Sequence, residues 1–320
     1  MSTGPDYELR GKRVYVAGHR GMVGSALVRR LEREGCEILT ASRQSADLRD
    51  QSVVTAWFEH HRPQAVFMAA ATVGGIYAND TRPSDFLYDN LAIASNVVHA
   101  AYRTGAEKLM FFGSTCIYPR LAPQPILEDA LLTGPLEPTN EWYAIAKIAG
   151  LKLCEAYRRQ HGCDFVSVMP TNLYGPGDNF DPLASHVLPA LLRRIGEAAE
   201  TGAPTVEIWG SGEPRREFLH VDDLADASIF LMRHWSADQH INIGCGEDIP
   251  IAELAALIGR IVGFTGEFVF DCSKPDGTPR KLVDVTRLTA LGWRPGIALE
   301  DGIRDVYRWY RENGPGRQSS

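Results

Sequence analysis

The sequence predicts an α/β protein with a doubly wound parallel sheet and a smaller, mixed α/β domain toward the C-terminus. Two observations predict this fold class. Strand-like and helix-like segments alternate through the first half of the 320-residue chain, and a glycine-rich loop joins the first strand to the first helix. The composition, with 44% hydrophobic and 23% charged residues, is that of a globular protein with a deep core, and it excludes a disordered or fibrous chain.

The hydrophobic pattern assigns the elements of the first half in order. Short β-rich runs predict strands at residues 13–17, 38–41, 65–70, 108–112 and 164–169. Helical periodicity predicts a helix that starts at about Met22 and is closed by Gly35, and further helices at residues 52–61, 84–103 and 139–160. Because right-handed crossovers join such strands, these segments predict one parallel sheet with helices on both faces.

The second half of the chain is less regular after Pro170. Turn-forming residues predict loops at 175–182, 197–204 and 210–214. Later segments predict helices at 222–233, 251–262 and 299–313, and a strand at 241–243. We interpret this half as a smaller cap on the first, with some segments that return to the large sheet.

Charge and cysteine usage exclude several classes of protein. The 40 acidic residues exceed the 33 basic ones, which is the opposite of the balance that a nucleic-acid-binding protein needs. The six cysteines form no C-x-x-C pair, so they predict reduced thiols and no metal site. No apolar run reaches the ~18 residues of a membrane helix, and the N-terminus lacks the apolar segment of a signal peptide. We therefore expect a cytoplasmic protein with neither a nucleic-acid nor a membrane partner.

A G-x-x-G-x-x-G loop follows the first predicted strand. Its glycines are Gly18, Gly21 and Gly24, and the helix opens at Met22 and Val23. Glycines let the backbone approach a pyrophosphate, and a helix N-terminus offers N–H donors and a partial positive charge. The loop therefore predicts a dinucleotide site, and a tight turn without a ligand is the alternative.

The end of the second strand predicts which dinucleotide binds. An NAD site carries an acidic residue about twenty residues beyond the glycines, where it bonds the ribose. This chain has Arg43 there and a second cation, Arg20, inside the glycine loop. These two arginines favour NADP(H), unless both are merely solvated surface residues. Asp47 and Leu48 follow at a point where the chain can flank the adenine.

These signals also predict how the chain is divided into domains. We expect residues 1–174 to form an NADP-binding Rossmann domain, joined by a returning segment near 218–245. Residues 175–217 and 246–313 are expected to form the substrate domain. Residues 314–320 are expected to be a flexible tail.

Three polar residues predict proton transfer at a carbonyl or alcohol. Tyr143 and Lys147 are four residues apart and therefore share one face of a predicted helix. An ammonium beside a phenol lowers the pKa of the phenol from about 10 toward neutral, so Tyr143 could exchange a proton with the substrate oxygen. Ser114 follows the strand at 108–112, at the edge where parallel sheets bind ligands, and could hold the same oxygen.

These motifs resemble those of the extended short-chain dehydrogenase/reductases. Longer segments are similar to the GDP-L-fucose synthase family, which epimerises GDP-4-keto-6-deoxymannose at C3 and C5 and reduces it at C4. The segments that carry this resemblance are GHRGMVGSA, GSTCIYP, EPTNEWYAIAKIAG, MPTNLYGPGDNF, WGSGEPRREFLHVDD and KPDGTPRKL. The resemblance extends from about residue 13 to about residue 313.

The resemblance implies roles for further residues. Cys116 and His186 match the family's acid–base pair for epimerisation, although the sequence does not assign acid and base between them; a buried thiol and a loop histidine are the structural alternatives. The matched cofactor contacts are Lys147, Pro170, Asn172, Leu173 and His186. The matched substrate contacts are Arg194, Trp209, Arg216 and Asp276. Three adjacent cations could be confused with the matched arginines, namely Arg193, Arg215 and Lys281.

The resemblance also implies NADP(H) as cofactor, a GDP-sugar as substrate, and a homodimer packed through the helices at 84–103 and 143–160.

One alternative is the same chemistry on a related GDP-sugar that gives GDP-L-colitose or a deoxyheptose, with Trp142 and the loop at 175–186 as the determinants. A 4-epimerase or 4,6-dehydratase is a weaker alternative, because Cys116 stands where dehydratases carry an acidic pair. A non-catalytic NADP sensor is disfavoured by the complete set of site residues.

Overall fold

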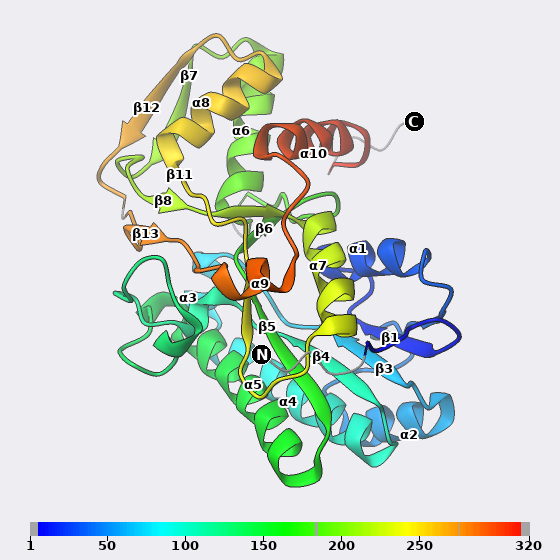
Figure 1. Ribbon diagram of the computed structural model, residues 1–320. Coiled ribbons are helices and arrows are strands. Elements are labelled where there is room, and N and C mark those ends of the chain that lie inside the picture. The colour runs from blue at the N-terminus through cyan, green and yellow to red at the C-terminus, as the bar shows by residue number, and fades with distance from the viewer. Residues whose placement is uncertain (1–5, 183–184, 275, 315–320) are drawn as a thin grey trace.

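A parallel sheet of six strands forms the centre of the computed structural model, which describes residues 6–182, 185–274 and 276–314 (Figure 1). The strand order is β10-β5-β4-β3-β1-β2. The bounds are β1 (Arg13–Ala17), β2 (Glu37–Leu39), β3 (Ala65–Met68), β4 (Lys108–Phe112), β5 (Asp164–Pro170) and β10 (Ile241–Ile243). The order changes direction at β1, which makes this a doubly wound sheet and confirms the predicted fold class.

Helices cover both faces of this sheet. One face carries α2 (Gln51–His61), α4 (Pro83–Arg103) and α5 (Glu141–His161). The other face carries α1 (Met22–Leu31) and α7 (Val221–His234), which pack against each other. The predicted returning segment thus includes α7 and β10, both of which pack with the large sheet.

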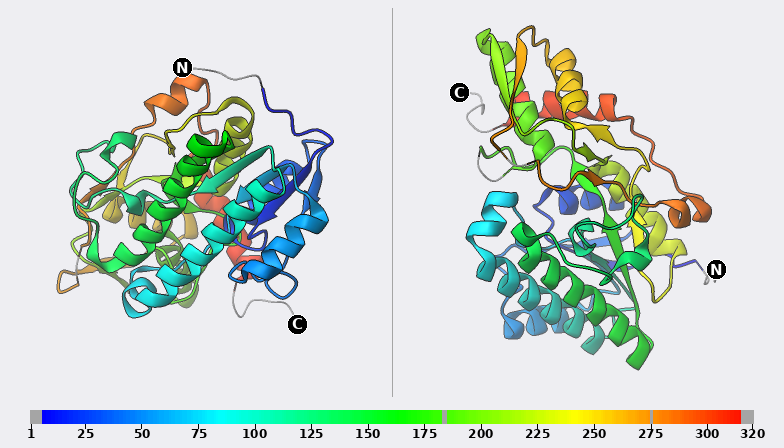
Figure 2. Two further views of the ribbon diagram at one scale, coloured as in Figure 1. Left: turned by 90° about the horizontal axis from the view of Figure 1, so that it is seen from below. Right: turned by 90° about the vertical axis from the view of Figure 1, so that its left-hand side faces the viewer.

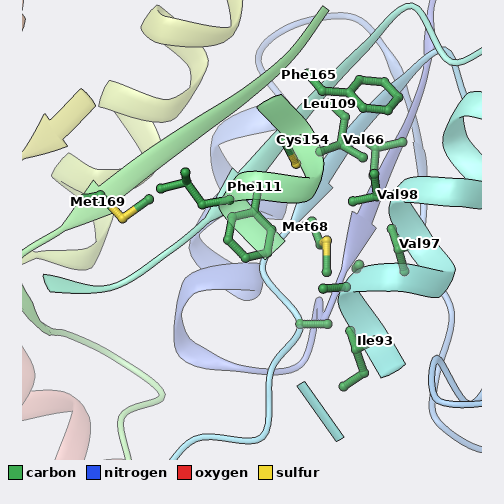
Figure 3. Close-up of a cluster of buried hydrophobic side chains, with 14 of the residues drawn as sticks. Val66, Met68, Ile93, Val97, Val98, Leu109, Phe111, Cys154, Phe165 and Met169 are labelled. Carbon is green, nitrogen blue, oxygen red and sulfur yellow. The ribbon is translucent and has the colours of Figure 1, made fainter. Parts of the chain in front are cut away.

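The strands alternate between two hydrophobic cores, because successive side chains of a strand point to opposite faces. In β3, Val66 and Met68 belong to the core beneath α4 and α5, whereas Ala65 and Phe67 belong to the core beneath α1 and α7. Both faces of the strand are therefore buried, which explains why it reads as a continuous apolar run. Figure 3 shows the first core with the labelled side chains Val66, Met68, Ile93, Val97, Val98, Leu109, Phe111, Cys154, Phe165 and Met169.

A second group of elements has its own core at one end of the molecule (Figures 1 and 2). Its members are α6 (Val187–Thr201), β7 (Thr205–Trp209), α8 (Ile251–Val262), β12 (Glu267–Asp271) and α10 (Leu299–Asn313). Leu192, Leu254 and Ile303 join the three helices in that core. β7 and β12 form a parallel pair beside them.

Short strands connect the two groups. β6 (Asn172–Tyr174) pairs with β9 (Phe218–His220), and β8 (Arg215–Arg216) pairs with both β11 (Ile249–Pro250) and β13 (Arg280–Lys281). The remaining helical segments are α3 (Ile76–Thr81), α9 (Thr286–Leu291), η1 (Thr115–Ile117), η2 (Glu128–Ala130) and η3 (Pro138–Asn140). α9 contacts β10, so the chain returns to the large sheet once more after β13. Of the predicted tail, residues 315–320 lie outside the described residues.

The predicted loop at 197–204 is wrong in its first part, because α6 continues to Thr201. Pro189 lies in the first turn of α6, where a helix needs no N–H donor, so it does not interrupt the helix. Gly202 then ends α6 in a left-handed conformation with φ of 67°. The helix places His186 at its N-cap and Arg194 in its middle.

In the part of the chain that the structure describes, no helix combines the length and the apolarity needed to cross a membrane.

Candidate active site

The glycine-rich loop connects β1 to α1 beside the end of β3. Gly18 has a left-handed φ of 82°, and a Cβ atom on it would lie 2.8 Å from the backbone of Ala70. A Cβ on Gly24 would lie 2.1 Å from the Gly18 carbonyl oxygen. A Cβ on Gly21 would come no nearer to a described atom than 3.6 Å, again the Gly18 oxygen. Gly18 and Gly24 therefore allow the turn to pack, and Gly21 leaves space next to the helix.

The N-terminus of α1 offers donors at this space. Met22, Val23 and Gly24 form its first turn, where N–H groups have no intrahelical acceptor, and the N-cap Gly21 contributes no side-chain acceptor. The helix dipole adds a partial positive charge at the same point. This open cradle of donors fits the pyrophosphate of a dinucleotide.

Arg20 lies within this loop, and Arg43 follows the end of β2. The neighbouring His19 has its pKa lowered by burial and by Arg20, while the backbone of Ala41 opposes the shift, so the loop and the end of β2 are in contact. Arg20 is exposed, and the Arg43 side chain keeps 68% of its surface accessible. Both guanidinium groups can therefore reach an anion at this end of the site.

Asp47 and Leu48 lie next to these arginines. Arg49 holds Asp47 with an Nη2–Oδ2 distance of 2.7 Å, and this pairing lowers the pKa of Asp47. Arg43 is more distant, with 3.5 Å between its Nε and Asp47 Oδ2. The Leu48 carbonyl accepts a hydrogen bond from Asn96 at 3.0 Å. An open pocket of about 410 Å³ adjoins them and is lined by Asp47, Arg49, Asp50 and Tyr88.

Ser114 and Cys116 lie on one turn at the end of β4. Ser114 is the N-cap of η1, and its Oγ accepts a hydrogen bond from the Cys116 N–H at 3.4 Å. The Cys116 side chain is buried, and burial raises the pKa of its thiol. Lys281, Ser114 and Lys147 act in the opposite direction on this pKa, so all three are close to the sulfur.

Tyr143 and Lys147 lie one helical turn apart at the start of α5, as their spacing predicts. Lys147 Nζ donates to the Phe112 carbonyl at 2.8 Å and lies 5.6 Å from the centre of the Tyr143 ring. Burial lowers the pKa of Lys147 to about 8 and raises the pKa of Tyr143. The expected fall in the phenol pKa is therefore absent, because desolvation of the phenolate outweighs the ammonium, whose Nζ binds a carbonyl.

His186 and Lys281 complete this cluster from the other side. His186 is the N-cap of α6, where its side chain makes no capping hydrogen bond. Burial and the nearby Lys281 lower the pKa of His186, so its imidazole is neutral at pH 7. Burial likewise lowers the pKa of Lys281, which interacts with Cys116 and Arg216. From the sequence, Lys281 is only one of three cations that could be confused with the arginines matched to the substrate. A two-residue strand such as β13 carries no pattern that predicts a lysine close to Cys116.

The predicted cofactor contacts after β5 also lie at the junction between the two groups of elements. Pro170 is the last residue of β5, and Asn172 and Leu173 begin β6. The Asn172 side-chain amide donates to the Glu217 carbonyl at 2.8 Å, which fixes the start of β6 against β9.

Arg194 and Trp209 form one side of the predicted substrate region. The Arg194 guanidinium lies 5.8 Å from the centre of the Trp209 ring and donates to the Glu207 carbonyl at 3.1 Å. Lys274 lies 5.6 Å from the centre of the same ring, and Trp209 as a residue is 59% exposed. By contrast, the adjacent Arg193 pairs with a carboxylate, that of Glu197, at 3.5 Å. Arg194 is therefore the better placed of the two arginines to bind an anion.

Arg216 and Asp276 form the other side. Arg216 Nη1 donates to the Arg215 carbonyl at 2.9 Å, and burial lowers the pKa of Arg216 while Asp276 opposes the shift. Asp276 accepts two hydrogen bonds from Ser211, at 2.7 and 2.9 Å. The adjacent Arg215 pairs with Asp248 at 2.7 Å. Arg215 thus has a structural partner, and Arg216 keeps donors for a ligand.

The residues described so far could supply two kinds of chemistry. A hydroxyl pair from Ser114 and Tyr143 can bind a carbonyl oxygen and supply a proton. A thiol at Cys116 and a neutral imidazole at His186 together hold one acid and one base. Among the described residues, no group of three or more His, Cys, Asp or Glu side chains could hold a metal ion.

Comparison with known proteins places the chain in a family. The family model described as "NAD dependent epimerase/dehydratase family" matches residues 14–244. A GDP-L-fucose synthase of Sinorhizobium fredii is 57% identical over 309 residues, which cover 97% of this chain and 98% of that protein. The structure of a GDP-6-OMe-4-keto-L-xylo-heptose reductase from C. jejuni has a TM-score of 0.89 and 38% identity, and covers 96% of this chain and 99% of that chain.

A second solved structure, a GDP-L-fucose synthetase from Naegleria fowleri bound to NADP, has a TM-score of 0.90 at 29% identity and covers 99% of this chain and 100% of that chain. Both structures match this chain over nearly its full length. The chain therefore belongs to the NAD dependent epimerase/dehydratase family and, within it, to the group of the GDP-L-fucose synthases.

Proposed function

We propose that this chain converts GDP-4-keto-6-deoxy-D-mannose to GDP-L-fucose: it inverts C3 and C5 and then reduces the C4 carbonyl with NADPH. The observation that carries the proposal is the placement of Ser114 and Cys116 on one turn after β4, where the Cys116 N–H binds Ser114 Oγ at 3.4 Å, next to Lys147, which donates to the Phe112 carbonyl at 2.8 Å at the end of the same strand. The 57% identity to a GDP-L-fucose synthase supports the same substrate.

NADP(H) is the cofactor, and the geometry of the chain fits it. The open side of Gly21 and the first-turn N–H groups of α1 suit the pyrophosphate, and Arg20 and Arg43 suit a 2′-phosphate. When bound, the reduced nicotinamide supplies a hydride to the carbonyl carbon. Lys147, Pro170, Asn172, Leu173 and His186 are the residues proposed to hold the nicotinamide end.

In the reduction, Tyr143 donates the proton to the C4 oxygen and Ser114 orients that oxygen. Burial raises the pKa of Tyr143, so the phenol is protonated at neutral pH and ready to act as an acid. Lys147, fixed by its bond to the Phe112 carbonyl, supplies positive charge at the base of the site.

In the epimerisation, Cys116 and His186 exchange protons with C3 and C5. The C4 carbonyl acidifies both C–H groups, and inversion needs a base on one face of the sugar and an acid on the other. The thiol and neutral imidazole provide one of each, and moving one proton between them exchanges the two roles. The hydroxyl groups of Ser114 and Tyr143 stabilise the enolate oxygen.

The GDP part is proposed to bind outside this centre. Arg194 and Arg216 provide guanidinium groups for the pyrophosphate, with Trp209 and Asp276 as further contacts. The same chemistry on a related GDP-sugar remains the second candidate, supported by the 38% identity to the heptose reductase. That identity is lower than the 57% found for the fucose synthase, which favours the 6-deoxy sugar.

One reaction in D₂O tests the proposal. The enzyme is mixed with GDP-4-keto-6-deoxymannose and NADPH, and the product is identified by NMR. GDP-L-fucose with deuterium at both C3 and C5 is the expected result. Exchange without reduction would contradict the proposed hydride transfer. If neither deuterium exchange nor NADPH consumption is observed, this substrate is excluded.

Arg43→Ala tests the proposed 2′-phosphate contact. We expect the Kd for NADPH to rise about tenfold and the Kd for NADH to stay within twofold, because NADH lacks the phosphate that a guanidinium binds. Fluorescence titration of each dinucleotide measures both constants. Arg82→Ala is the matched control, since Arg82 is another exposed arginine paired with an aspartate, at 2.9 Å from Asp85. Equal weakening of NADPH and NADH by Arg43→Ala would contradict the assignment.

We also propose a homodimer packed through α4 and α5 and a cytoplasmic location. The proposed face includes Tyr88 on α4 and Ile145 on α5, which expose 70% and 38% of their surfaces. Apolar surface of this kind favours association with a second copy.

A further inference from the structure

Glu217 is a fully buried carboxylate that the proposed reaction does not use. Its exposed fraction is 0%. Its Oε1 accepts hydrogen bonds from the N–H groups of Cys245 and Gly246, both at 2.7 Å, and its Oε2 accepts one from Val283 at 3.0 Å. Burying a carboxylate is costly unless donors of this kind compensate it, so Glu217 holds these two backbone segments tightly.

The backbone of Glu217 extends this network to both ligand regions. Its N–H donates to the Lys281 carbonyl at 3.3 Å, and its carbonyl accepts from the Asn172 side chain at 2.8 Å. Glu217 lies between β8, which ends at Arg216, and β9. In the parallel pair of β8 and β13, Arg216 is the partner of Lys281.

The side chain of Glu217 acts on one segment in particular, residues 280–284, which we call the strap. Val283, two residues after Lys281, is fixed to the Glu217 carboxylate, and the preceding N–H of Leu282 is fixed to Gln124 Oε1 at 2.9 Å. The strap is therefore held from both sides. Its Lys281 is the register partner of Arg216, and its ammonium is near enough to Cys116 and His186 to affect the pKa of both.

We propose that Glu217 is a positioning residue for substrate binding: its carboxylate anchors the strap and thereby sets where Lys281 and Arg216 meet the diphosphate of the nucleotide. This inference rests on the proposed function. The bond that anchors the strap comes from the Glu217 carboxylate, whereas the bond to Asn172 on the cofactor side comes from the Glu217 backbone carbonyl, which side-chain variants keep.

Two variants displace the carboxylate in different ways. Glu217→Gln keeps the shape but puts an NH₂ group against an N–H donor, either at Val283 or at the pair Cys245 and Gly246. Gly244→Ala keeps the charge, but its Cβ would lie 2.3 Å from Glu217 Oε1 and 2.7 Å from Val283 Cγ2, so it would push apart the carboxylate and the strap residue that it binds. Glu34→Gln is the matched control, because Glu34 is a buried carboxylate paired with Arg30 and Arg233 on α1 and α7.

Titration calorimetry with GDP and, separately, with NADPH tests the proposal on the full chain. Glu217→Gln and Gly244→Ala should raise the Kd for GDP about tenfold, the effect of losing one charge-assisted hydrogen bond, and leave the Kd for NADPH within twofold. Glu34→Gln should lower the melting temperature but leave both constants within twofold. An unchanged Kd for GDP, or an equal rise of both constants, would overturn the positioning role.

Hydrogen exchange separates this inference from the proposed function. If Glu217 anchors the strap, the amides of residues 280–284 exchange faster in Glu217→Gln and Gly244→Ala than in the wild type. In Glu34→Gln they exchange at the wild-type rate. Unchanged exchange in the strap would overturn the inference even if GDP binds. Failure of the wild type to bind GDP would instead overturn the proposed substrate, and faster strap exchange would then still support the anchoring role of Glu217.

Discussion

Replacing Tyr143 with phenylalanine is expected to lower the rate of carbonyl reduction by about 10²–10⁴-fold, the usual contribution of a positioned acid. The Kd for NADPH should change less than twofold. The variant removes one oxygen and keeps the ring, whose edge-to-face contact with Phe86 at 6.3 Å persists. Lys147 keeps its bond to the Phe112 carbonyl, so the floor of the site stays in place.

The sign of the pKa shifts supports this expectation. Burial raises the pKa of Tyr143, so the phenol keeps its proton at neutral pH and can donate it as the C4 oxygen gains charge. Burial lowers the pKa of Lys147 to about 8, which leaves the ammonium mostly charged at pH 7. Tyr143 thus serves as the acid in the direction of reduction, while the Lys147 ammonium, which donates to the Phe112 carbonyl, supplies positive charge.

NADPH oxidation under saturating substrate and a fluorescence titration of NADPH measure the two quantities separately. Tyr157→Phe is the control, because Tyr157 lies on the same helix but bonds His99 at 2.7 Å at the other end of α5. It should leave both quantities unchanged. Loss of NADPH binding in Tyr143→Phe would show that the hydroxyl has a structural role.

The sequence predicted the parts of this site that local chemistry determines. β1, β4, α8 and α10 have the predicted bounds, because buried parallel strands form clear apolar runs and amphipathic helices carry a regular period. The glycine loop and the Tyr143–Lys147 pair lie where their motifs place them. The end of α6 was missed, because Gly196 lies inside the helix and Gly202 and Pro204 follow closely, so the segment has the composition of a loop although packing against α8 stabilises a helix.

Other features depend on tertiary contacts that no local pattern encodes. Lys281 lies beside Arg216 only because β13 pairs with β8 across a long separation in the sequence. Glu217 binds backbone N–H groups, which have no residue signature, so its role was invisible in the sequence. The raised pKa of Tyr143 likewise follows from burial, whereas the spacing to Lys147 alone suggested a fall.

Cys116→Ser is expected to stall epimerisation, with inversion at C3 and C5 lowered by at least about 10²-fold and NADPH binding unchanged. A serine hydroxyl is a far weaker acid than a thiol, so it keeps its proton and can neither release it to the substrate carbon nor accept one as an alkoxide at the same pH. Burial raises the pKa of the Cys116 thiol, and Lys281, Ser114 and Lys147 offset part of that rise. These neighbours can stabilise a thiolate during turnover, but they cannot make an alkoxide accessible.

The stereochemistry of the product makes this test specific. With Cys116 gone, His186 can still remove a proton and return deuterium to the same face, so exchange without inversion would identify Cys116 as the group on the opposite face. Cys154→Ser is the control, since Cys154 is equally buried but lies in the core beneath α5. Normal inversion in Cys116→Ser would contradict its assignment, because His186 alone offers a single face, and inversion requires two.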